Sequence, residues 1–202
     1  MWFLIVLGVI LVAFLVAMLV MKRMMKKLME ERAPSERRFP LEGGKRALLL
    51  YQPTRHDTAS RYAVQIAEGL NERGYDVTVN FAGESLPYDL NDYELLIFGT
   101  GAYMSMGAIP VRRYLRNHPF SRKQVVLFSV GSNLQADPEI EQMKAEIPHG
   151  NILYRIKVAR NQEDVMADFL ERLELENPDF DNLPEEEEDF EEEDDESGDG
   201  QE

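Results

Sequence analysis

Apolar and polar positions along residues 45–175 change repeatedly between two periodicities. Short apolar runs of strand length are separated by longer stretches in which apolar residues recur every three or four positions. The runs cover residues 47–51, 75–82, 94–99, 124–130 and 151–158, and the amphipathic stretches cover residues 59–70, 111–117, 138–146 and 163–175. Strands that alternate with helices in this way form a parallel sheet with helices on both faces. The fold class is therefore predicted to be α/β.

The first 20 residues form one apolar run without a charged side chain. About 20 such residues are long enough, as a helix, to cross the ~30 Å hydrocarbon core of a bilayer. A cleaved signal peptide would carry its basic residues before the apolar run, whereas here they come afterwards, at Lys22, Arg23, Lys26 and Lys27. We therefore expect an uncleaved transmembrane anchor at residues 1–21 of a single-pass protein of the cell membrane. The positive-inside rule then places the soluble domain in the cytoplasm.

The remaining chain divides into three segments by composition. Residues 22–44 are predicted to form a basic juxtamembrane helix to about residue 31 and then a linker, because residues 33–44 hold two prolines and two glycines. The α/β domain is predicted at residues 45–178, and a disordered acidic tail at residues 179–202. Thirteen of the 18 residues at 185–202 are Asp or Glu, so the formal net charge of −15 falls to −2 without them. The acidity thus belongs to the tail and says nothing about the partners of the folded domain. We expect no nucleic-acid partner.

Composition also limits the chemistry. Cysteine is absent, which excludes disulfides, thiolate metal sites, iron–sulfur clusters and cysteine nucleophiles. The histidines, His56, His118 and His149, lie far apart in the chain and lack the spacing of metal ligands. We therefore predict no metal site and assign no catalytic residue, and whether the protein is an enzyme stays open.

Three of the predicted loops share a composition suited to ligand binding. Residues 52–58, 100–107 and 131–133 follow the first, third and fourth predicted strands and are rich in Gly, Ser, Thr or Asn. The carboxyl ends of parallel strands meet at one edge of the sheet, where α/β domains bind ligands. The first loop also brings hydroxyl groups to a helix N-terminus, an arrangement that holds phosphate. Ordinary βα loops are rich in the same residues, so a scaffold without a ligand is the alternative interpretation.

Residues 45–158 resemble the flavodoxin-type FMN domains, in particular the branch that includes flavodoxin-like protoporphyrinogen oxidase. The resemblance rests on the strand followed by the Thr58 loop, on the segment DYELLIFGTGAYMSMG, on the helix that ends near Asn117 and on the strand VVLFSV. It implies a doubly wound, five-stranded parallel sheet in the order 2-1-3-4-5. It also implies FMN as the cofactor.

The resemblance assigns site residues by position in each loop. The first loop would face the FMN phosphate, the second the isoalloxazine ring and the third the other edge of that ring. In loop order these residues are Thr54, Arg55, His56, Asp57 and Thr58, then Thr100, Gly101, Ala102 and Tyr103, then Gly131, Ser132 and Asn133.

The first loop departs from the family pattern. Where the family usually has Thr-Gly-Asn-Thr, this chain has Arg55, His56, Asp57 and Thr58. His56 replaces a glycine, which adopts left-handed backbone angles more readily than histidine does. Asp57 adds a negative charge beside a phosphate dianion. These departures favour a flavodoxin-derived scaffold that acts as a membrane-attached interaction module without flavin. The glycines and hydroxyls of the three loops favour a membrane-tethered FMN protein that transfers electrons between redox partners. A flavoenzyme similar to protoporphyrinogen oxidase is a further alternative.

Overall fold

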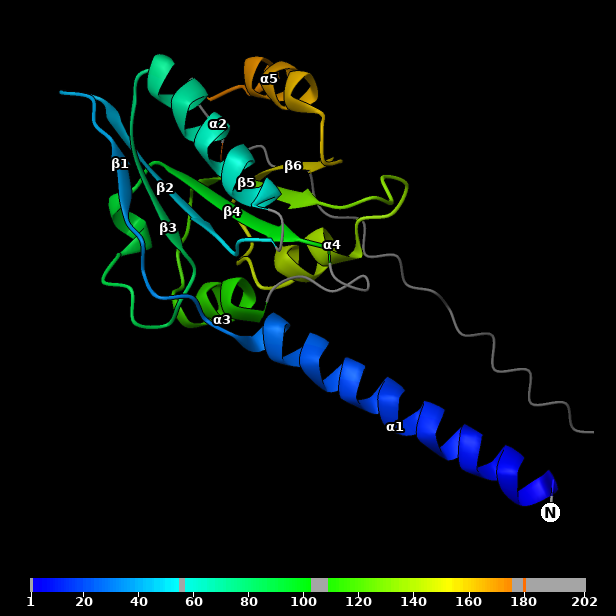
Figure 1. Cartoon of the computed structure of the whole chain (residues 1–202). Coiled ribbons are helices and arrows are strands. Elements are labelled where there is room, and N and C mark those ends of the chain that lie inside the picture. Colours follow the sequence, from blue (N-terminus) through cyan, green and yellow to red (C-terminus); the bar gives the residue numbers. More distant parts are fainter. Residues whose placement is uncertain (1, 55–56, 103–108, 176–179, 181–202) are drawn as a thin grey trace, which may run out of the picture.

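The computed structural model describes residues 2–54, 57–102, 109–175 and 180. It consists of a twisted sheet with helices on both faces and a long N-terminal helix that projects away from the sheet (Figure 1). Its elements in chain order are α1 (Trp2–Met29), β1 (Arg37–Phe39), β2 (Lys45–Tyr51), α2 (Thr58–Glu72), β3 (Tyr75–Phe81), the 3-10 helix η1 (Leu90–Asp92), β4 (Leu95–Gly101), α3 (Ile109–Asn117), β5 (Gln124–Val130), α4 (Pro138–Lys144), β6 (Ile152–Val158) and α5 (Glu163–Arg172).

The sheet has one strand more than the sequence predicts. Its order is β1-β3-β2-β4-β5-β6. The five strands from β2 to β6 are parallel and follow the expected order, whereas β1 pairs antiparallel with β3 at the edge. The prediction of five strands is therefore wrong, because it omits the edge strand β1. β1 lies in the segment predicted as a linker, and three residues with two arginines carry no apolar periodicity that would have revealed it.

Alternate residues of the strands enter two separate cores. Ala47 and Leu49 of β2 pack with α2 and α5 on one face of the sheet, while Leu48 and Leu50 pack with α3 and α4 on the other. Figure 1 shows α2 and α5 on one side of the sheet and α3 and α4 on the opposite side. Burial on both faces explains why the central strands read as continuous apolar runs rather than as alternating ones.

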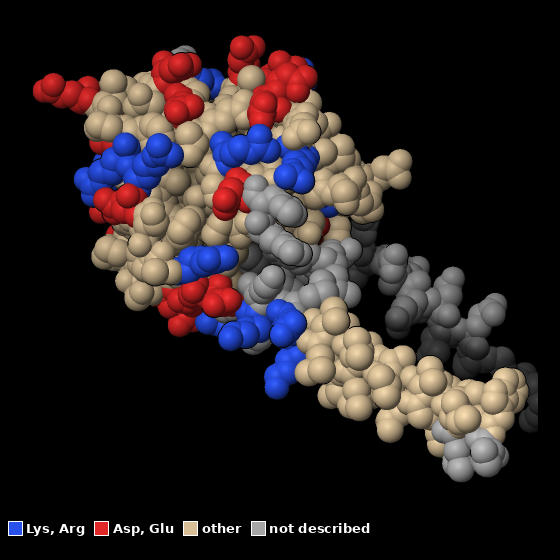
Figure 2. All heavy atoms as spheres, in the orientation of Figure 1, with Lys and Arg blue, Asp and Glu red and all other residues tan. Residues whose placement is uncertain are grey.

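α1 leaves its apolar side chains in contact with solvent. Phe14 and Leu19 are each 64% exposed, which distinguishes α1 from the buried core helix of a soluble protein. The segment Ile5–Arg23 is long and apolar enough to cross a membrane, a property that N-terminal signal sequences share. Charged side chains appear only where α1 meets the domain, and the outer part of the helix has none (Figure 2).

Some sequence-based predictions fall on residues outside the described ranges. They concern Arg55 and His56 in the first loop, Tyr103 in the second, and the acidic tail apart from Phe180.

Candidate functional site

The three predicted binding loops begin side by side at the carboxyl edge of the sheet. They follow β2, β4 and β5, which are neighbours in the sheet. Backbone hydrogen bonds continue the ladder into the loops: Gln52 N donates to Gly99 O at 3.0 Å and Ala102 N donates to Val130 O at 2.9 Å. The structure therefore brings together the described residues of all three loops, as the sequence predicts.

The first loop places two threonines at the N-terminus of α2. Thr58 is the first residue of the helix and is 4% exposed. Thr54 Oγ1 accepts a hydrogen bond from Ala59 N at 3.2 Å, and Thr54 O accepts one from Asp57 N at 3.2 Å. The Thr54 hydroxyl uses a lone pair to accept the Ala59 N–H, which leaves its own hydrogen available to donate. A hydroxyl donor thus stands beside the backbone N–H groups that begin the helix.

Asp57 turns the chain into α2. Its φ of 53° and ψ of 15° are left-handed, a conformation that Asp and Asn adopt more readily than most residues. Its carboxylate makes no capping hydrogen bond to the helix. Burial raises the pKa of the neighbouring Tyr51 phenol, and the negative charge of Asp57 raises it further. Position 56, where the sequence analysis expects a demanding turn, lies outside the described residues, and the described left-handed residue of this loop is Asp57.

The second and third loops approach each other closely. Thr100 and Gly101 complete β4 as buried residues, and Ala102 follows at half-buried depth. A Cβ atom on Gly131 would lie 2.9 Å from Ala102 Cβ and 3.0 Å from Lys157 Cε. Gly131 is therefore required by close packing rather than by an unusual backbone angle.

The rest of the third loop is open to solvent. Ser132 and Asn133 are exposed. Asn133 Oδ1 accepts a hydrogen bond from Gln135 N at 3.1 Å, which closes a local turn. The Ser132 side chain is thus accessible to a ligand or a partner, while Asn133 first stabilises its own loop.

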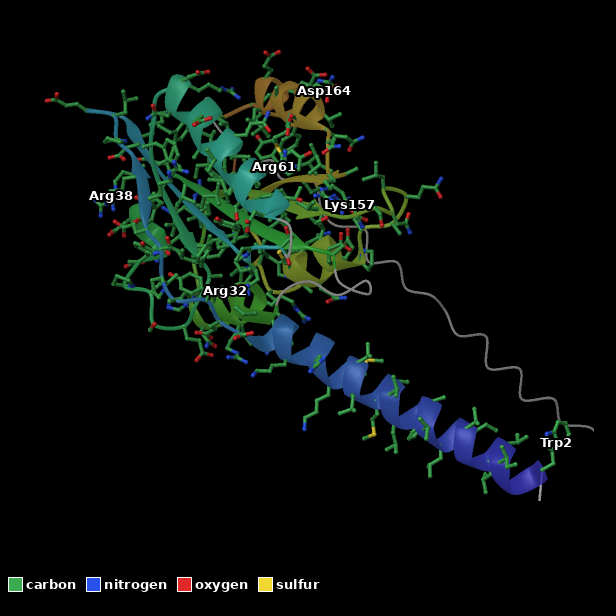
Figure 3. All side chains as sticks on the ribbon, viewed as in Figure 1. Trp2, Arg32, Arg38, Arg61, Lys157 and Asp164 are labelled. Atoms are coloured by element: carbon green, nitrogen blue, oxygen red, sulfur yellow. The ribbon has the colours of Figure 1, made fainter. Side chains whose placement is uncertain are left out.

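A buried ion pair between Glu139 and Lys157 packs against the third loop at Gly131. The sequence analysis did not identify this pair. Glu139 of α4 is fully buried and lies 2.7 Å from Lys157 Nζ of β6, which is 8% exposed. Ser129 Oγ of β5 donates to the same Glu139 oxygen at 2.6 Å, and Lys157 also donates to Ala136 O. Lys157 lies near the end of β6, close to this loop (Figure 3). The sequence held one sign of this pair: Ser129 is a polar residue within the apolar part of β5, which indicates a buried polar partner.

The first loop is also tied to the N-terminal helix. Gln52, the first loop residue after β2, is 4% exposed, and its Nε2 donates to Glu30 O at 2.8 Å. The other carboxamide atom, Gln52 Oε1, is buried and has no hydrogen-bond partner within the described ranges. The sequence gives no sign of this contact, because it joins residues 22 positions apart through a backbone carbonyl.

The donor set fits a phosphate better than it fits a metal. Residues 2–54, 57–102, 109–175 and 180 contain no group of three His, Asp or Glu side chains that could hold a metal ion. The start of α2 offers backbone N–H groups, the positive end of the helix dipole and the hydroxyls of Thr54 and Thr58. The Asp57 carboxylate, beside this donor set, is the one described group there that opposes an anion. The start of α2 is therefore chemically suited to an anionic group, apart from the Asp57 carboxylate beside it.

Comparisons with known proteins agree with this architecture. No family model matches the chain, and no curated protein matches it. The structure of oxidised flavodoxin 2 from Bacillus cereus is similar, with a TM-score of 0.51 at 15% identity, over 62% of this chain and 92% of that one. A short-chain flavodoxin associated with a non-canonical PDU bacterial microcompartment has a TM-score of 0.50 at 13% identity, over 63% and 95% of the two chains. The α/β domain of this protein therefore has the flavodoxin-like fold.

Proposed function

We propose that this protein binds FMN at the carboxyl edge of the sheet and transfers electrons between redox partners while α1 tethers it to a membrane. The observation that carries the proposal is the start of α2, where the Thr54 hydroxyl bonds the Ala59 N–H and, with the Thr58 hydroxyl, lies at the positive end of the helix dipole. The flavodoxin-like fold supports the same ligand, because such domains bind at this edge of the sheet.

The residues of the three loops divide the binding task. Thr54 and Thr58 donate hydrogen bonds to the phosphate, and the helix dipole of α2 stabilises its charge. Ala102 and Gly131 border the space for the isoalloxazine ring, and the ion pair beneath Gly131 keeps this border in place. FMN, when bound, supplies one- and two-electron transfer. The protein contributes binding and orientation.

One observation favours a second function, that of a scaffold without flavin. The Asp57 carboxylate makes no hydrogen bond to the helix that would occupy it, so its charge remains beside the phosphate position. Two carboxyl or phosphate charges in such proximity repel each other unless a cation intervenes. In a membrane-attached interaction module without flavin, this charge would have no bound phosphate to repel.

Replacing Thr58 with alanine is expected to weaken FMN binding by roughly ten-fold or more. A hydrogen bond to a charged group contributes about 1.5–3 kcal/mol, and ~1.4 kcal/mol corresponds to one decade in the dissociation constant. Riboflavin lacks the phosphate, so its affinity should change little. The measurement is quenching of flavin fluorescence by the full chain in detergent. Thr78→Ala in β3 is the matched control, and an equal loss for riboflavin and FMN would contradict phosphate binding by Thr58.

Replacing Asp57 with asparagine is expected to tighten FMN binding by roughly five-fold, since two unit charges ~4 Å apart interact by about 1 kcal/mol in water. Asparagine keeps the size of the side chain and tolerates the left-handed backbone of this position. Fluorescence titration of both chains with FMN measures the change. Negligible binding of FMN to wild type and to Asp57→Asn alike would reject the flavin proposal in favour of the scaffold.

A further inference from the structure

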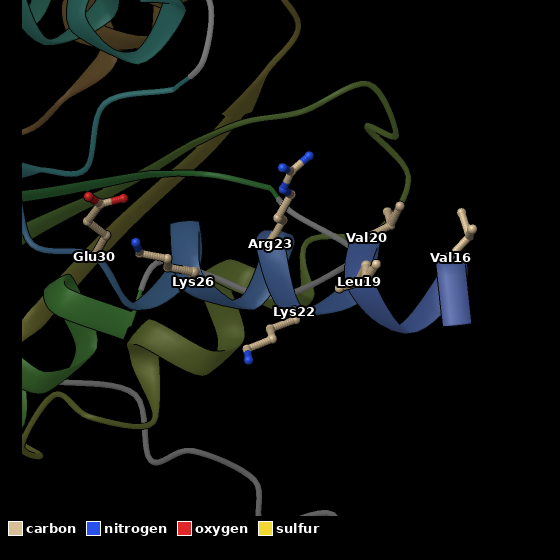
Figure 4. A pocket seen from close by; sticks show the side chains of 7 residues that line it. All are labelled: Val16, Leu19, Val20, Lys22, Arg23, Lys26 and Glu30. Carbon is tan, nitrogen blue, oxygen red and sulfur yellow. The ribbon is translucent and has the colours of Figure 1, made fainter. Parts of the chain in front are cut away.

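A groove runs along the part of α1 that approaches the domain. It has a volume of about 900 Å³ and is lined at one end by Val16, Leu19 and Val20. Its other end is lined by charged residues, among them Arg23 and Lys26 (Figure 4). One groove thus joins an apolar surface to a cationic one within a few turns of the same helix.

The lining follows one face of the helix. Residues 16, 19, 20, 23, 26 and 30 recur at spacings of three and four, which places them on a common side. In Figure 4 the side chains of Arg23, Lys26 and Glu30 extend to one side of the helix and that of Lys22 extends to the other, and all four line the groove. Arg23 and Lys26 form no ion pair with any other residue in the described ranges, and both are exposed. Arg23 and Lys26 therefore bring two exposed cations to the groove, with Lys22 as a third lining cation and Glu30 as the one lining carboxylate among the described residues.

Specific contacts fix this groove beside the candidate site. Gln52 Nε2, in the first loop, donates to Glu30 O at 2.8 Å. Glu31 Oε1 lies 3.4 Å from Arg113 Nη1 of α3, and Ser35 N donates to Asn80 Oδ1 of β3 at 2.7 Å. Because Gln52 and Asn80 belong to the carboxyl ends of their strands, α1 meets the sheet at the edge that carries the candidate site. The cations and the site therefore lie on the same side of the domain.

The two ends of the groove match the two parts of a lipid. The valines and the leucine belong to the apolar segment that fits the hydrocarbon core, and Arg23 and Lys26 come at its end, at the level of the headgroups. Arginine binds a phosphodiester with two parallel hydrogen bonds, and lysine adds a point charge. Glu30 disfavours an anion farther along the groove, so the phosphate is confined to the level of the two cations.

We infer that this groove binds the head of an anionic phospholipid, which holds the carboxyl edge of the sheet against the membrane surface. The redox partner that reaches the candidate site is then a component of the same membrane. This inference rests on the membrane tether of the proposed function and does not depend on FMN. It specifies which side of the domain faces the lipid.

Lipid retention tests the cationic end of the groove. The full chain is purified from membranes that contain phosphatidylglycerol, and the bound lipid is measured by native mass spectrometry. Replacing Arg23 and Lys26 together with glutamine should lower retention by roughly thirty-fold, the effect of two cations at about 1 kcal/mol each. Lys45→Gln with Lys123→Gln removes the same charge at the opposite edge of the sheet and should leave retention unchanged. An equal loss in the two double variants would overturn the inference, because it would show only general charge attraction.

Spin labels test the orientation. The chain contains no cysteine, so Ser132→Cys and Glu72→Cys each create a single labelling site, at the carboxyl edge and at the opposite edge of the sheet. In nanodiscs with phosphatidylglycerol, a lipid-bound relaxation agent should affect the label at position 132 much more strongly than the label at position 72. This difference should disappear in pure phosphatidylcholine and in the Arg23→Gln, Lys26→Gln variant. Equal effects at both positions, or no dependence on the anionic lipid, would reject the inference.

Two further measurements separate this inference from the proposed function. Release of the wild-type chain by alkaline carbonate would reject the membrane tether, and titration with FMN tests flavin binding separately.

Discussion

Replacing Glu139 with glutamine is expected to lower the free energy of unfolding by about 3–5 kcal/mol, because it leaves the buried charge of Lys157 without a partner. Lys157 is 8% exposed and Glu139 is fully buried, so water cannot replace the lost carboxylate without movement of the loop above them. In the variant, the Ser129 hydroxyl would keep an acceptor only if the oxygen of the new amide took the place of Glu139 Oε1. The amide NH₂ group would then take the place of Glu139 Oε2, which has no hydrogen-bond partner within the described ranges.

Urea unfolding of the full chain in detergent, followed by circular dichroism, measures this loss. Glu163→Gln is the matched control, because Glu163 pairs with Arg61 at 2.8 Å on the surface, where both side chains are at least half exposed. Exposed pairs contribute only about 0–1 kcal/mol. Adding Lys157→Met to Glu139→Gln should recover most of the lost stability, since removing both charges also removes the unpaired one. A loss no larger than that of Glu163→Gln would show that the pair is not buried in solution.

The same pair has a consequence for the candidate site. Lys157 contacts the carbonyl of Ala136 and lies where a side chain at position 131 would have to go. The third loop is therefore positioned by residues of α4 and β6 that follow it in the chain. Under the proposed function, a variant that loses the pair should lose affinity for FMN together with stability, whereas Thr58→Ala should mainly affect affinity.

The parallel sheet could be predicted from the sequence because burial on both faces leaves a strong local signal. The predicted run at residues 124–130 coincides with β5, and the helices α2 and α5 begin within one residue of the predicted stretches. The three loops could be assigned to one edge because parallel strands all end on the same side. These predictions needed only periodicity and topology.

The contacts that organise the candidate site could not be predicted in the same way. The pairs Gln52 with Glu30 and Glu139 with Lys157 join residues that are distant in sequence, and each residue alone is an ordinary polar side chain. The left-handed residue at Asp57 was hidden for another reason, since asparagine and aspartate are common both in turns and on helix caps. Local patterns carry no information on which of these roles a residue adopts.

β1 provides the last test, through the position at which a soluble chain is made to begin. A chain that starts at Lys45 keeps the five parallel strands but loses β1, whereas one that starts at Arg32 keeps all six. We expect the shorter chain to be less stable by about 2–4 kcal/mol. Phe39 packs against the core of the α2 face, and its carbonyl accepts a hydrogen bond from Asn71 Nδ2 at 3.0 Å. Partial burial of an aromatic ring and a few hydrogen bonds account for a loss of this size.

The segment before β1 adds a contact of its own. Tyr88 Oη donates to Glu36 Oε2 at 2.6 Å, and burial together with this hydrogen bond raises the pKa of Tyr88 to about 12. The bond from Tyr88 also lowers the pKa of the Glu36 carboxyl. A depressed carboxyl pKa stabilises the fold above its unfolded value and loses this contribution as the pH falls through the folded value. The stability advantage of the chain that starts at Arg32 should therefore be complete at neutral pH and should shrink only as the pH falls below 4.5, the ordinary pKa of a glutamate carboxyl.

Urea unfolding of both chains at neutral and acidic pH measures these differences. Phe39→Ala in the chain that starts at Arg32 separates the packing of the ring from the pairing of the strand, and it should account for only part of the loss. Without β1 the edge of β3 is unpaired, and its apolar, β-branched residues present a template for association. The shorter chain should thus also aggregate at lower concentration. Equal stability and solubility of the two chains would mean that β1 contributes nothing to the fold and that residues 33–44 act only as a linker.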